Sequence, residues 1–220
     1  MEQQRRGIPS FEAHGELAFE LVHATEAAAL RCAALMGRGD PDGMAEAAAA
    51  AMRGALERSW LTGKVRLSPR QQMALPLGTV LGRGDRLVDL GVYPLEGSSQ
   101  VARGHINAVS LLVAVEPDGF AQLPEVSQME KFVAGPSARG AIELDGSIAD
   151  NLRRIAFSRD LRVQDLTVAI LERPRHQELV AEVAAAGARI RNLEEGDFAS
   201  AVMAAMPGTG IDAAIGIGDL

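Results

Sequence analysis

The feature that most constrains the fold is the alternation of short apolar segments with helical segments in the second half of the chain. Strand-like segments at 166–171, 188–191 and 211–215 are separated by helical patterns at 174–186 and 196–206. Strands that alternate with helices of about ten to fifteen residues indicate βαβ units and a parallel sheet. This half of the chain is therefore predicted to have an α/β fold.

The first half reads as a pair of helices followed by a sheet. Apolar residues recur at steps of three and four over 11–36, and a second helix is expected over 42–59. The remaining elements expected from the pattern are strands at 64–67, 87–92, 106–115, 131–134 and 140–144, and a helix at 149–158. Together the two halves predict one domain over 1–220, with sub-lobes at 1–135 and 136–220.

Composition excludes several classes of protein. A formal net charge of −7 provides no global basic field for nucleic acid, and 4% aromatic residues provide few stacking surfaces for bases. The longest apolar run, 108–115, is far shorter than the roughly 20 residues of a membrane span, and the N-terminus lacks an apolar signal core. A single cysteine excludes an intrachain disulfide. We therefore expect a cytoplasmic protein without nucleic-acid or membrane partners.

The segment Arg173-Pro174-Arg175-His176 is the best candidate for an anion site, since it follows a strand and opens a helix. Proline suits the first helical turn, and guanidinium groups beside free amides can hold a phosphate. The alternative is an ordinary solvated helix start. His176 lies beside these cations and is a candidate catalytic acid or base.

A set of short peptides in order along the chain is similar to class II fructose-bisphosphatases, a family of the metal-dependent, lithium-sensitive phosphatase superfamily. The peptides that carry this resemblance are Thr25-Glu26-Ala27-Ala28-Ala29-Leu30, Gly37-Arg38-Gly39-Asp40, Gly82-Arg83-Gly84-Asp85 with Val88-Asp89, Pro94-Leu95-Glu96-Gly97, Met129-Glu130-Lys131, Ala149-Asp150-Asn151-Leu152-Arg153, Arg173-Pro174-Arg175-His176, Glu195-Gly196-Asp197 and Gly216-Ile217-Gly218. The resemblance implies a layered α-β-α sandwich of the sugar phosphatase type, here shortened at its C-terminus. It also implies removal of the 1-phosphate from fructose bisphosphate with Mg²⁺ or Mn²⁺.

The departures from the family fall on its metal ligands. Ala45, the loop 68–72 and Tyr93 stand where the resemblance implies acidic residues, and Glu96 is the matching ligand that is retained. Magnesium is held by carboxylates, water and substrate phosphate, so these losses predict that no cofactor is bound. Mg²⁺ or Mn²⁺ is expected only if Asp40, Asp85 and Asp89 rebuild a site, and the alternative for Asp40 and Asp85 is turn capping.

The residues that match the substrate side of the family are better retained. The resemblance implies that Gly97, Ser98 and Ser99 meet the scissile phosphate and that Arg173 and Arg175 contact substrate phosphate. It places Lys131 and Asp197 near the sugar. The alternative for Gly97, Ser98 and Ser99 is an ordinary turn, and the alternative for Lys131 and Asp197 is a role in a surface salt bridge. Glu96, Tyr93 and His176 are the catalytic candidates.

Three functions follow from these patterns. The first is a degenerate family member that binds a phosphorylated sugar or related anion, as a regulator or with altered chemistry. The second is an active phosphatase-family hydrolase with a rebuilt or partner-completed site, and the third is an interaction module. A homo-oligomer is expected to cover the strand at 211–215, which would lie near a sheet edge. An active paralogue is a further expected partner.

Overall fold

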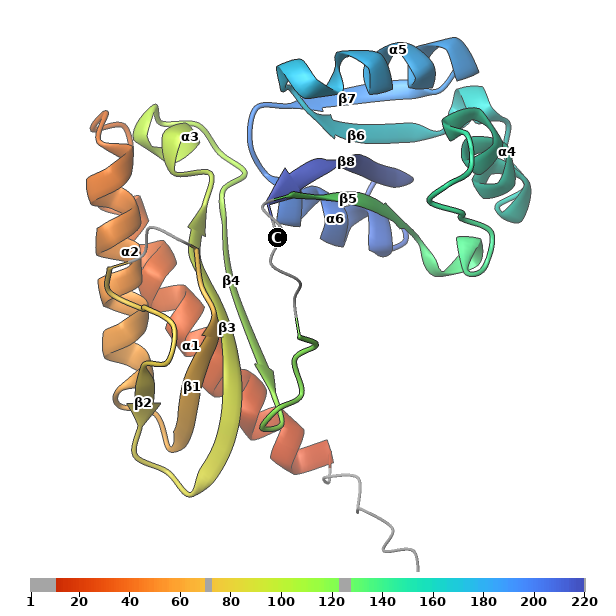
Figure 1. Ribbon diagram of the computed structural model, residues 1–220. Helices are drawn as coiled ribbons and strands as arrows, with labels where there is room; N and C mark the ends of the chain where they lie inside the picture. Colours follow the sequence, from red (N-terminus) through yellow and green to blue (C-terminus); the bar gives the residue numbers. More distant parts are fainter. Residues whose placement is uncertain (1–10, 70–72, 123–127, 220) are drawn as a thin grey trace, which may run out of the picture. The chain divides into compact units, whose positions relative to one another are not determined.

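The computed structural model describes residues 11–69, 73–122 and 128–219 (Figure 1). The chain divides into two compact units, Met1–Gln122 and Leu123–Leu220. The expected sub-lobes, 1–135 and 136–220, differ from these units because residues 128–134 pair with a strand at the end of the chain. Each unit has its own sheet and its own core.

The first unit is a four-stranded sheet with helices. Its elements are α1 (Phe11–Ala33), α2 (Pro41–Leu56), β1 (Leu61–Leu67), β2 (Val80–Gly82), β3 (Arg86–Glu96), α3 (Ser98–Ala102) and β4 (Val109–Val115). The strand order is β2-β1-β3-β4, in which β1 and β3 are parallel and the other pairs are antiparallel. The helix pair and the strands were predicted, whereas β2 and α3 were not.

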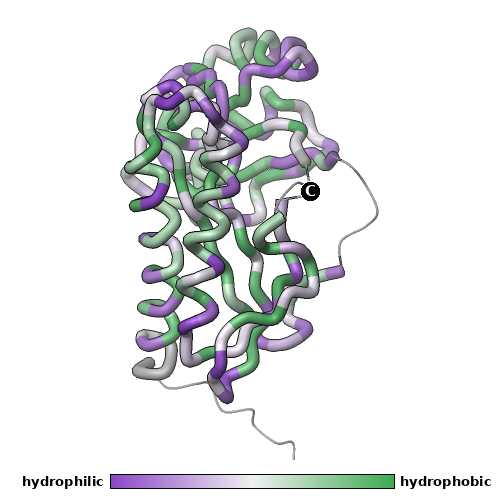
Figure 2. The backbone as a smooth tube through the Cα atoms, turned by 90° about the vertical axis from the view of Figure 1, so that its left-hand side faces the viewer, coloured by the Kyte–Doolittle hydropathy of each residue, from purple (hydrophilic) through white to green (hydrophobic). Residues whose placement is uncertain are grey.

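The core of the first unit lies between α1, α2 and one face of the sheet. Alternate residues of β3, among them Val88 and Leu90, are buried against helix residues such as Ala28 and Met52. Figure 2 shows the same amphipathic pattern, with hydrophilic residues recurring along the helices between hydrophobic ones. The periods of two and about 3.6 residues therefore fix which side chains of this unit face the core.

The two Gly-Arg-Gly-Asp peptides differ in their structural roles. In the first, Asp40 is the N-cap of α2, and its Oδ1 accepts from the Gly43 N–H at 2.9 Å. In the second, Gly84 lies so close to the backbone just before β1 that a Cβ atom would stand 0.9 Å from the Trp60 carbonyl oxygen. The first peptide thus caps a helix, and the second allows two backbone segments to approach each other.

The second unit has a four-stranded sheet between helices. Its elements are β5 (Gln128–Ala134), α4 (Ile148–Ser158), β6 (Thr167–Leu171), α5 (Gln177–Ala186), β7 (Arg189–Leu193), α6 (Asp197–Ala205) and β8 (Ala213–Asp219). The order is β5-β8-β6-β7, and β6 is parallel to both of its neighbours. The predicted parallel βαβ arrangement, and with it the α/β class, is confirmed.

Both faces of this sheet are covered. Val168, Ile170 and Ala213 pack in a core that includes residues of α4 and α5. Ala169 and Ala214, which point the opposite way, pack against Ala204 of α6. The second unit is therefore a helix–sheet–helix sandwich.

Two expectations about this unit were wrong. Residues 140–144 form turns instead of a strand, and Asn151 holds them through hydrogen bonds with the backbone of Glu143 at 2.9 and 2.7 Å. The strand predicted at 211–215 belongs to β8, which lies between β5 and β6 and not near an edge. Because β8 is paired on both sides, it does not need a second copy of the chain to cover it, and the homo-oligomer remains a prediction. Among the described helices, none has the length and apolar character needed to cross a membrane.

Candidate functional site

A β-bulge shapes the end of β3, where Tyr93 and Glu96 lie. Tyr93 pairs with Leu111 and Glu96 with Val109, so two residues of β3 stand opposite one residue of β4. Leu111 and Val109 are two residues apart and point to the same face of the sheet. The bulge thus brings Tyr93 and Glu96 to one face, which is a common use of bulges beside functional sites. Glu96 is 6% exposed and Tyr93 is half-buried.

The segment after Glu96 begins a helix and is not an ordinary turn. Gly97 has a φ of 90° and is the N-cap of the short helix α3, whose first residues are Ser98 and Ser99. A Cβ atom at Gly97 would lie 3.1 Å from the Cβ of Ala108, so both the conformation and the space favour glycine. The two serines are half-buried and are separated from Glu96 only by Gly97.

The acids expected to rebuild a metal site do not gather at Glu96. Asp40 caps α2, and Asp85 is exposed in the turn before β3. Asp89 is buried, where its Oδ1 lies 3.1 Å from Arg66 Nε and its Oδ2 accepts from the Asp118 N–H at 2.8 Å. Among the described residues, no three histidine, cysteine, aspartate or glutamate side chains are grouped so as to hold a metal ion.

The pKa of Asp89 agrees with a carboxylate that already has Arg66 and the Asp118 N–H as partners. Burial tends to raise the pKa of this carboxyl, but hydrogen bonds from Arg66 and the Asp118 N–H outweigh that effect. Together with the charges of Arg66 and Lys64, they hold the pKa of Asp89 below its ordinary value. Asp89 is therefore an ionised structural group.

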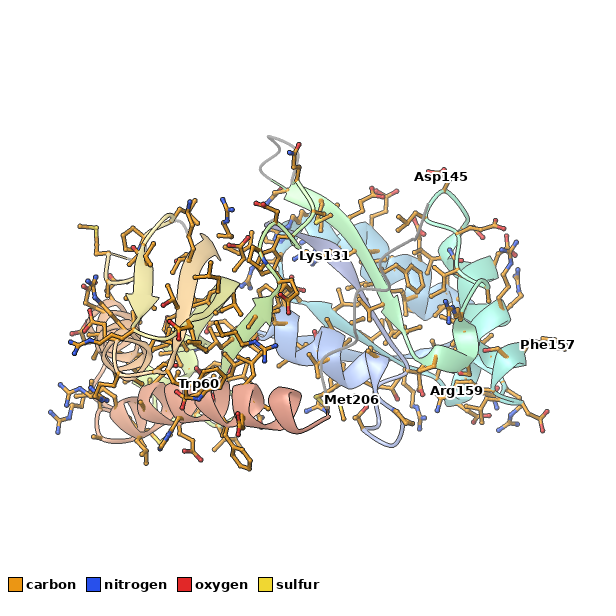
Figure 3. The ribbon with its side chains drawn as sticks, turned by 90° about the horizontal axis from the view of Figure 1, so that it is seen from below. Trp60, Lys131, Asp145, Phe157, Arg159 and Met206 are labelled. Carbon is orange, nitrogen blue, oxygen red and sulfur yellow. The ribbon has the colours of Figure 1, made fainter. Side chains whose placement is uncertain are left out.

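In the second unit, Lys131 and Asp197 meet above the end of β8. Lys131 projects from β5 (Figure 3), and its Nζ lies 2.7 Å from Asp197 Oδ2 at the start of α6. The same Nζ lies 5.8 Å from the centre of the Phe198 ring. A Cβ atom at Gly218 would stand 2.9 Å from both partners of the ion pair. The Lys131–Asp197 ion pair therefore packs directly against the backbone of Gly218.

The basic segment after β6 approaches the same strand. Arg175 donates from Nε to the Ile217 carbonyl oxygen at 2.9 Å, and Arg173 donates to the Glu172 carbonyl oxygen at 2.8 Å. Arg175 is exposed and Arg173 is half-buried. An open hollow beside this segment is lined by Leu171, Glu172, Arg173, Pro174, His176, Gln177, Val180 and Asn192. Lys131, Asp197 and Arg175 are thus all brought to the last residues of β8.

The expectation that His176 acts as an acid or base is not compatible with its surroundings. Its side chain is 1% exposed, and Nδ1 lies 2.7 Å from the Leu171 carbonyl oxygen. Nε2 accepts from the Ile217 N–H at 2.8 Å. Because both ring nitrogens are engaged by the backbone, the ring has no nitrogen left for a substrate.

Comparison with known proteins identifies the family. Residues 15–219 match the family described as "Bacterial fructose-1,6-bisphosphatase, glpX-encoded". The chain belongs to this family. It is 36% identical over 210 residues to fructose-1,6-bisphosphatase 1 class 2 of Escherichia coli (strain K12) and to fructose-1,6-bisphosphatase class 2 of Shigella flexneri. In each case the match covers 92% of this chain and 61% of the relative, so the chain spans about three fifths of these bisphosphatases.

Membership of this bisphosphatase family overturns the expectation that no cofactor is needed. The resemblance associates this family with Mg²⁺ or Mn²⁺, so an expectation of no cofactor conflicts with the family to which the chain belongs. The described residues of the first unit do not by themselves supply the donors. Glu96 is well placed at the end of β3, but Asp40 and Asp89 are committed to a helix cap and an ion pair.

Several structural features of the two units could not be identified from the sequence. Gly216 and Gly218 were noted only as part of a motif, although glycines inside a strand signal close approach of another group. Phe198 and the Asp89–Arg66 pair had no signal in the sequence, since each depends on contacts between distant segments.

Proposed function

We propose that this chain binds a phosphorylated sugar through a cluster formed by Lys131, Arg173, Arg175 and Asp197, called here the phosphosugar cluster. The observation that carries the proposal is the convergence of Lys131, Asp197 and Arg175 on Gly218 and Ile217 of β8. Guanidinium and ammonium groups bind phosphate oxygens through charge-assisted hydrogen bonds, and Asp197 can accept from sugar hydroxyl groups. The cluster combines the two kinds of group that a phosphosugar requires.

We further propose that the described residues support family-type hydrolysis only weakly. A two-metal phosphoryl-transfer site needs carboxylates that hold two ions roughly 3.5–4 Å apart. Tyr93 stands where the resemblance implies an acid beside Glu96, and Asp40 and Asp89 have structural partners. In this proposal the chain acts mainly as a phosphosugar-binding, regulatory member of its family, and its cytoplasmic location remains a prediction.

The second candidate is an active metal-dependent phosphosugar phosphatase. Family membership and the retained, buried Glu96 favour it. In that case a second copy of the chain or an active paralogue would supply the remaining carboxylates. A third candidate, an interaction module without a ligand, is weakened by the convergence of cations and Asp197 at one strand end.

Titration calorimetry with fructose 1,6-bisphosphate tests the binding proposal. Lys131→Met and Arg175→Ala are each expected to weaken binding at least about tenfold, the effect of losing one charge-assisted hydrogen bond. Arg139→Ala is the matched control, because Arg139 is an exposed arginine of the same unit outside the cluster. Equal affinities for all four proteins would contradict the proposed site.

Phosphate release separates the binding and hydrolytic candidates. With Mg²⁺ or Mn²⁺ present, the wild-type chain is expected to release phosphate from fructose 1,6-bisphosphate slowly. Glu96→Gln, which keeps the shape of the side chain but removes its charge, provides the comparison. Rapid metal-dependent turnover by the wild type that Glu96→Gln abolishes would establish the active phosphatase instead.

A further inference from the structure

The phosphosugar cluster has two halves, the Arg173–Arg175 segment and the Lys131–Asp197 pair, which come from different elements. Both must be held against the same strand if their separation is to be fixed. Arg173 and Arg175 follow β6, whereas Lys131 belongs to β5 and Asp197 begins α6. The ladder between β5 and β8 runs from Gln128–Asp219 to Ala134–Ala213, so Lys131 is held firmly against β8. The pairing of β6 with β8 is short and covers only Val168–Ala213 and Ala169–Ala214. The basic segment after β6 therefore needs another attachment to β8.

His176 provides that attachment. Beyond Ala214, its ring takes the place beside β8 that β6 no longer fills, and Nε2 accepts from the Ile217 N–H at 2.8 Å. Arg175 donates to the carbonyl oxygen of the same residue at 2.9 Å. A Cβ atom at Gly216 would lie 3.2 Å from His176 Cε1, so the glycine allows the ring to approach the strand. The side chains of Arg175 and His176 thus continue the hydrogen bonding of the sheet.

The contacts also assign the proton on the ring. Nδ1 lies 2.7 Å from the Leu171 carbonyl oxygen, which can only accept, so Nδ1 carries the hydrogen. Nε2 is then free of hydrogen and accepts from Ile217, and the approach of Nε2 to the Ile217 carbonyl oxygen at 3.2 Å is not a hydrogen bond. The opposite tautomer would set an unprotonated Nδ1 against the Leu171 oxygen and leave the Ile217 N–H without its acceptor. The neutral Nδ1–H form satisfies every group.

We propose that His176 is a positioning residue that sets the distance between Arg173–Arg175 and the Lys131–Asp197 pair through Ile217 and Gly218 of β8. It does not touch the ligand, and the proposal rests on the phosphosugar cluster being the binding site. This positioning is expected to make the cluster selective for sugar bisphosphates over inorganic phosphate. A ligand that reaches both halves of the cluster, such as a sugar bisphosphate, depends on their separation, whereas inorganic phosphate needs only one half.

Two amide substitutions of matched chemistry test the role of the ring. In His176→Gln the terminal amide reaches the place of Nε2 and can accept from the Ile217 N–H, whereas in His176→Asn it reaches only the place of Nδ1. His176→Asn is expected to weaken fructose 1,6-bisphosphate binding at least about tenfold, a typical result of misplaced binding groups. It should leave the affinity for inorganic phosphate nearly unchanged, and His176→Gln should retain most of the selectivity. His105→Asn, an exposed histidine of the first unit, is the control.

A measurement without ligand separates this proposal from the proposed function. Amide hydrogen exchange of the full chain should show a protected Ile217 N–H in the wild type and in His176→Gln, with protection lost in His176→Asn. Long-range proton–nitrogen spectra of the wild type should show the Nδ1–H tautomer at neutral pH, whether or not the variants fold. An Nε2–H tautomer, or equal losses of affinity for the bisphosphate and for phosphate in His176→Asn, would overturn the positioning role. If the wild type binds no bisphosphate although the Ile217 N–H is protected as expected, the proposed function is wrong, but the hydrogen bond from Ile217 to His176 is still supported.

Discussion

Lys131 Nζ and Asp197 Oδ2 lie 2.7 Å apart directly above Gly218, where a Cβ atom would stand 2.9 Å from each of them. The two side chains come from β5 and α6, so the absence of a side chain on β8 is what lets them meet at this point. Both atoms end flexible side chains, and a methyl group at Gly218 would move the pair more readily than it would unfold the sheet.

Gly218→Ala is therefore expected to affect ligand binding more than stability. The free energy of unfolding should change by less than about 1 kcal/mol, since the displaced atoms can rotate away. Fructose 1,6-bisphosphate affinity, measured by calorimetry, should fall about tenfold because the binding groups are misplaced. Gly15→Ala, in the helix α1 with open space around it, is the control and should bind normally. Unchanged affinity in Gly218→Ala would show that the pair does not contact the ligand.

The repeated Gly-Arg-Gly-Asp peptide offers a matched test of two glycine roles. At Gly84 a Cβ atom would stand 0.9 Å from the Trp60 carbonyl oxygen, so Gly84→Ala should reduce the free energy of unfolding by more than about 3 kcal/mol. At Gly39 the space is open and only the φ of +75° disfavours alanine, so Gly39→Ala should cost about 1–2 kcal/mol. Urea denaturation measures both. Similar losses would mean that the backbone around Gly84 can move away from Trp60 at little cost, and that close approach does not explain this glycine.

Local patterns predicted most of the elements but not their long-range pairing. The helices α1 and α2 and the strands β6 and β7 follow from periodicity, because core packing in this fold respects those periods. The pairing of β5 with β8 joins residues far apart in the sequence, and β8 consequently lies inside the sheet where an edge was expected. No local signal reports which distant strand a segment will meet.

The candidate site could likewise be predicted only in part, because its residues are local motifs but their surroundings come from distant segments. The retained motif residues were identified from sequence, and the structure brings Lys131, Asp197 and Arg175 to one strand end. The environment of His176 could not be read from its neighbours in the chain, because its burial depends on Leu171 and Ile217 from two strands. The bulge that turns Glu96 to the face of Tyr93 likewise depends on the register of β4.

Asp89 is predicted to make the first unit sensitive to acid. Its pKa is lower in the folded state than in the unfolded chain, because the hydrogen bonds from Arg66 and Asp118 outweigh burial. Its contribution is therefore present above the unfolded pKa of about 4 and is lost as the pH falls through the folded pKa. Thermal unfolding followed from pH 7 into this acid range should show a smaller loss of Tm for Asp89→Asn than for wild type, from a lower starting value at pH 7. Asp85→Asn, at an exposed turn position, should follow the wild-type curve.

Tyr93→Asp is predicted to strengthen metal binding at the end of β3. The bulge places residue 93 on the same face as the buried Glu96, so an aspartate would add a second carboxylate next to a retained one. Mg²⁺ and Mn²⁺ bind through oxygen ligands, and each added carboxylate raises their affinity. Calorimetry with Mn²⁺ should show affinity at least about tenfold higher than for wild type, the scale of effect that groups around a metal exert. Tyr93→Asn, which has the same size as the aspartate but no charge, should show little gain, and adding Glu96→Gln to Tyr93→Asp should abolish it. If Tyr93→Asn binds Mn²⁺ as well as Tyr93→Asp, removal of the tyrosine ring and not the new carboxylate would explain the gain, and the two side chains would not share a metal.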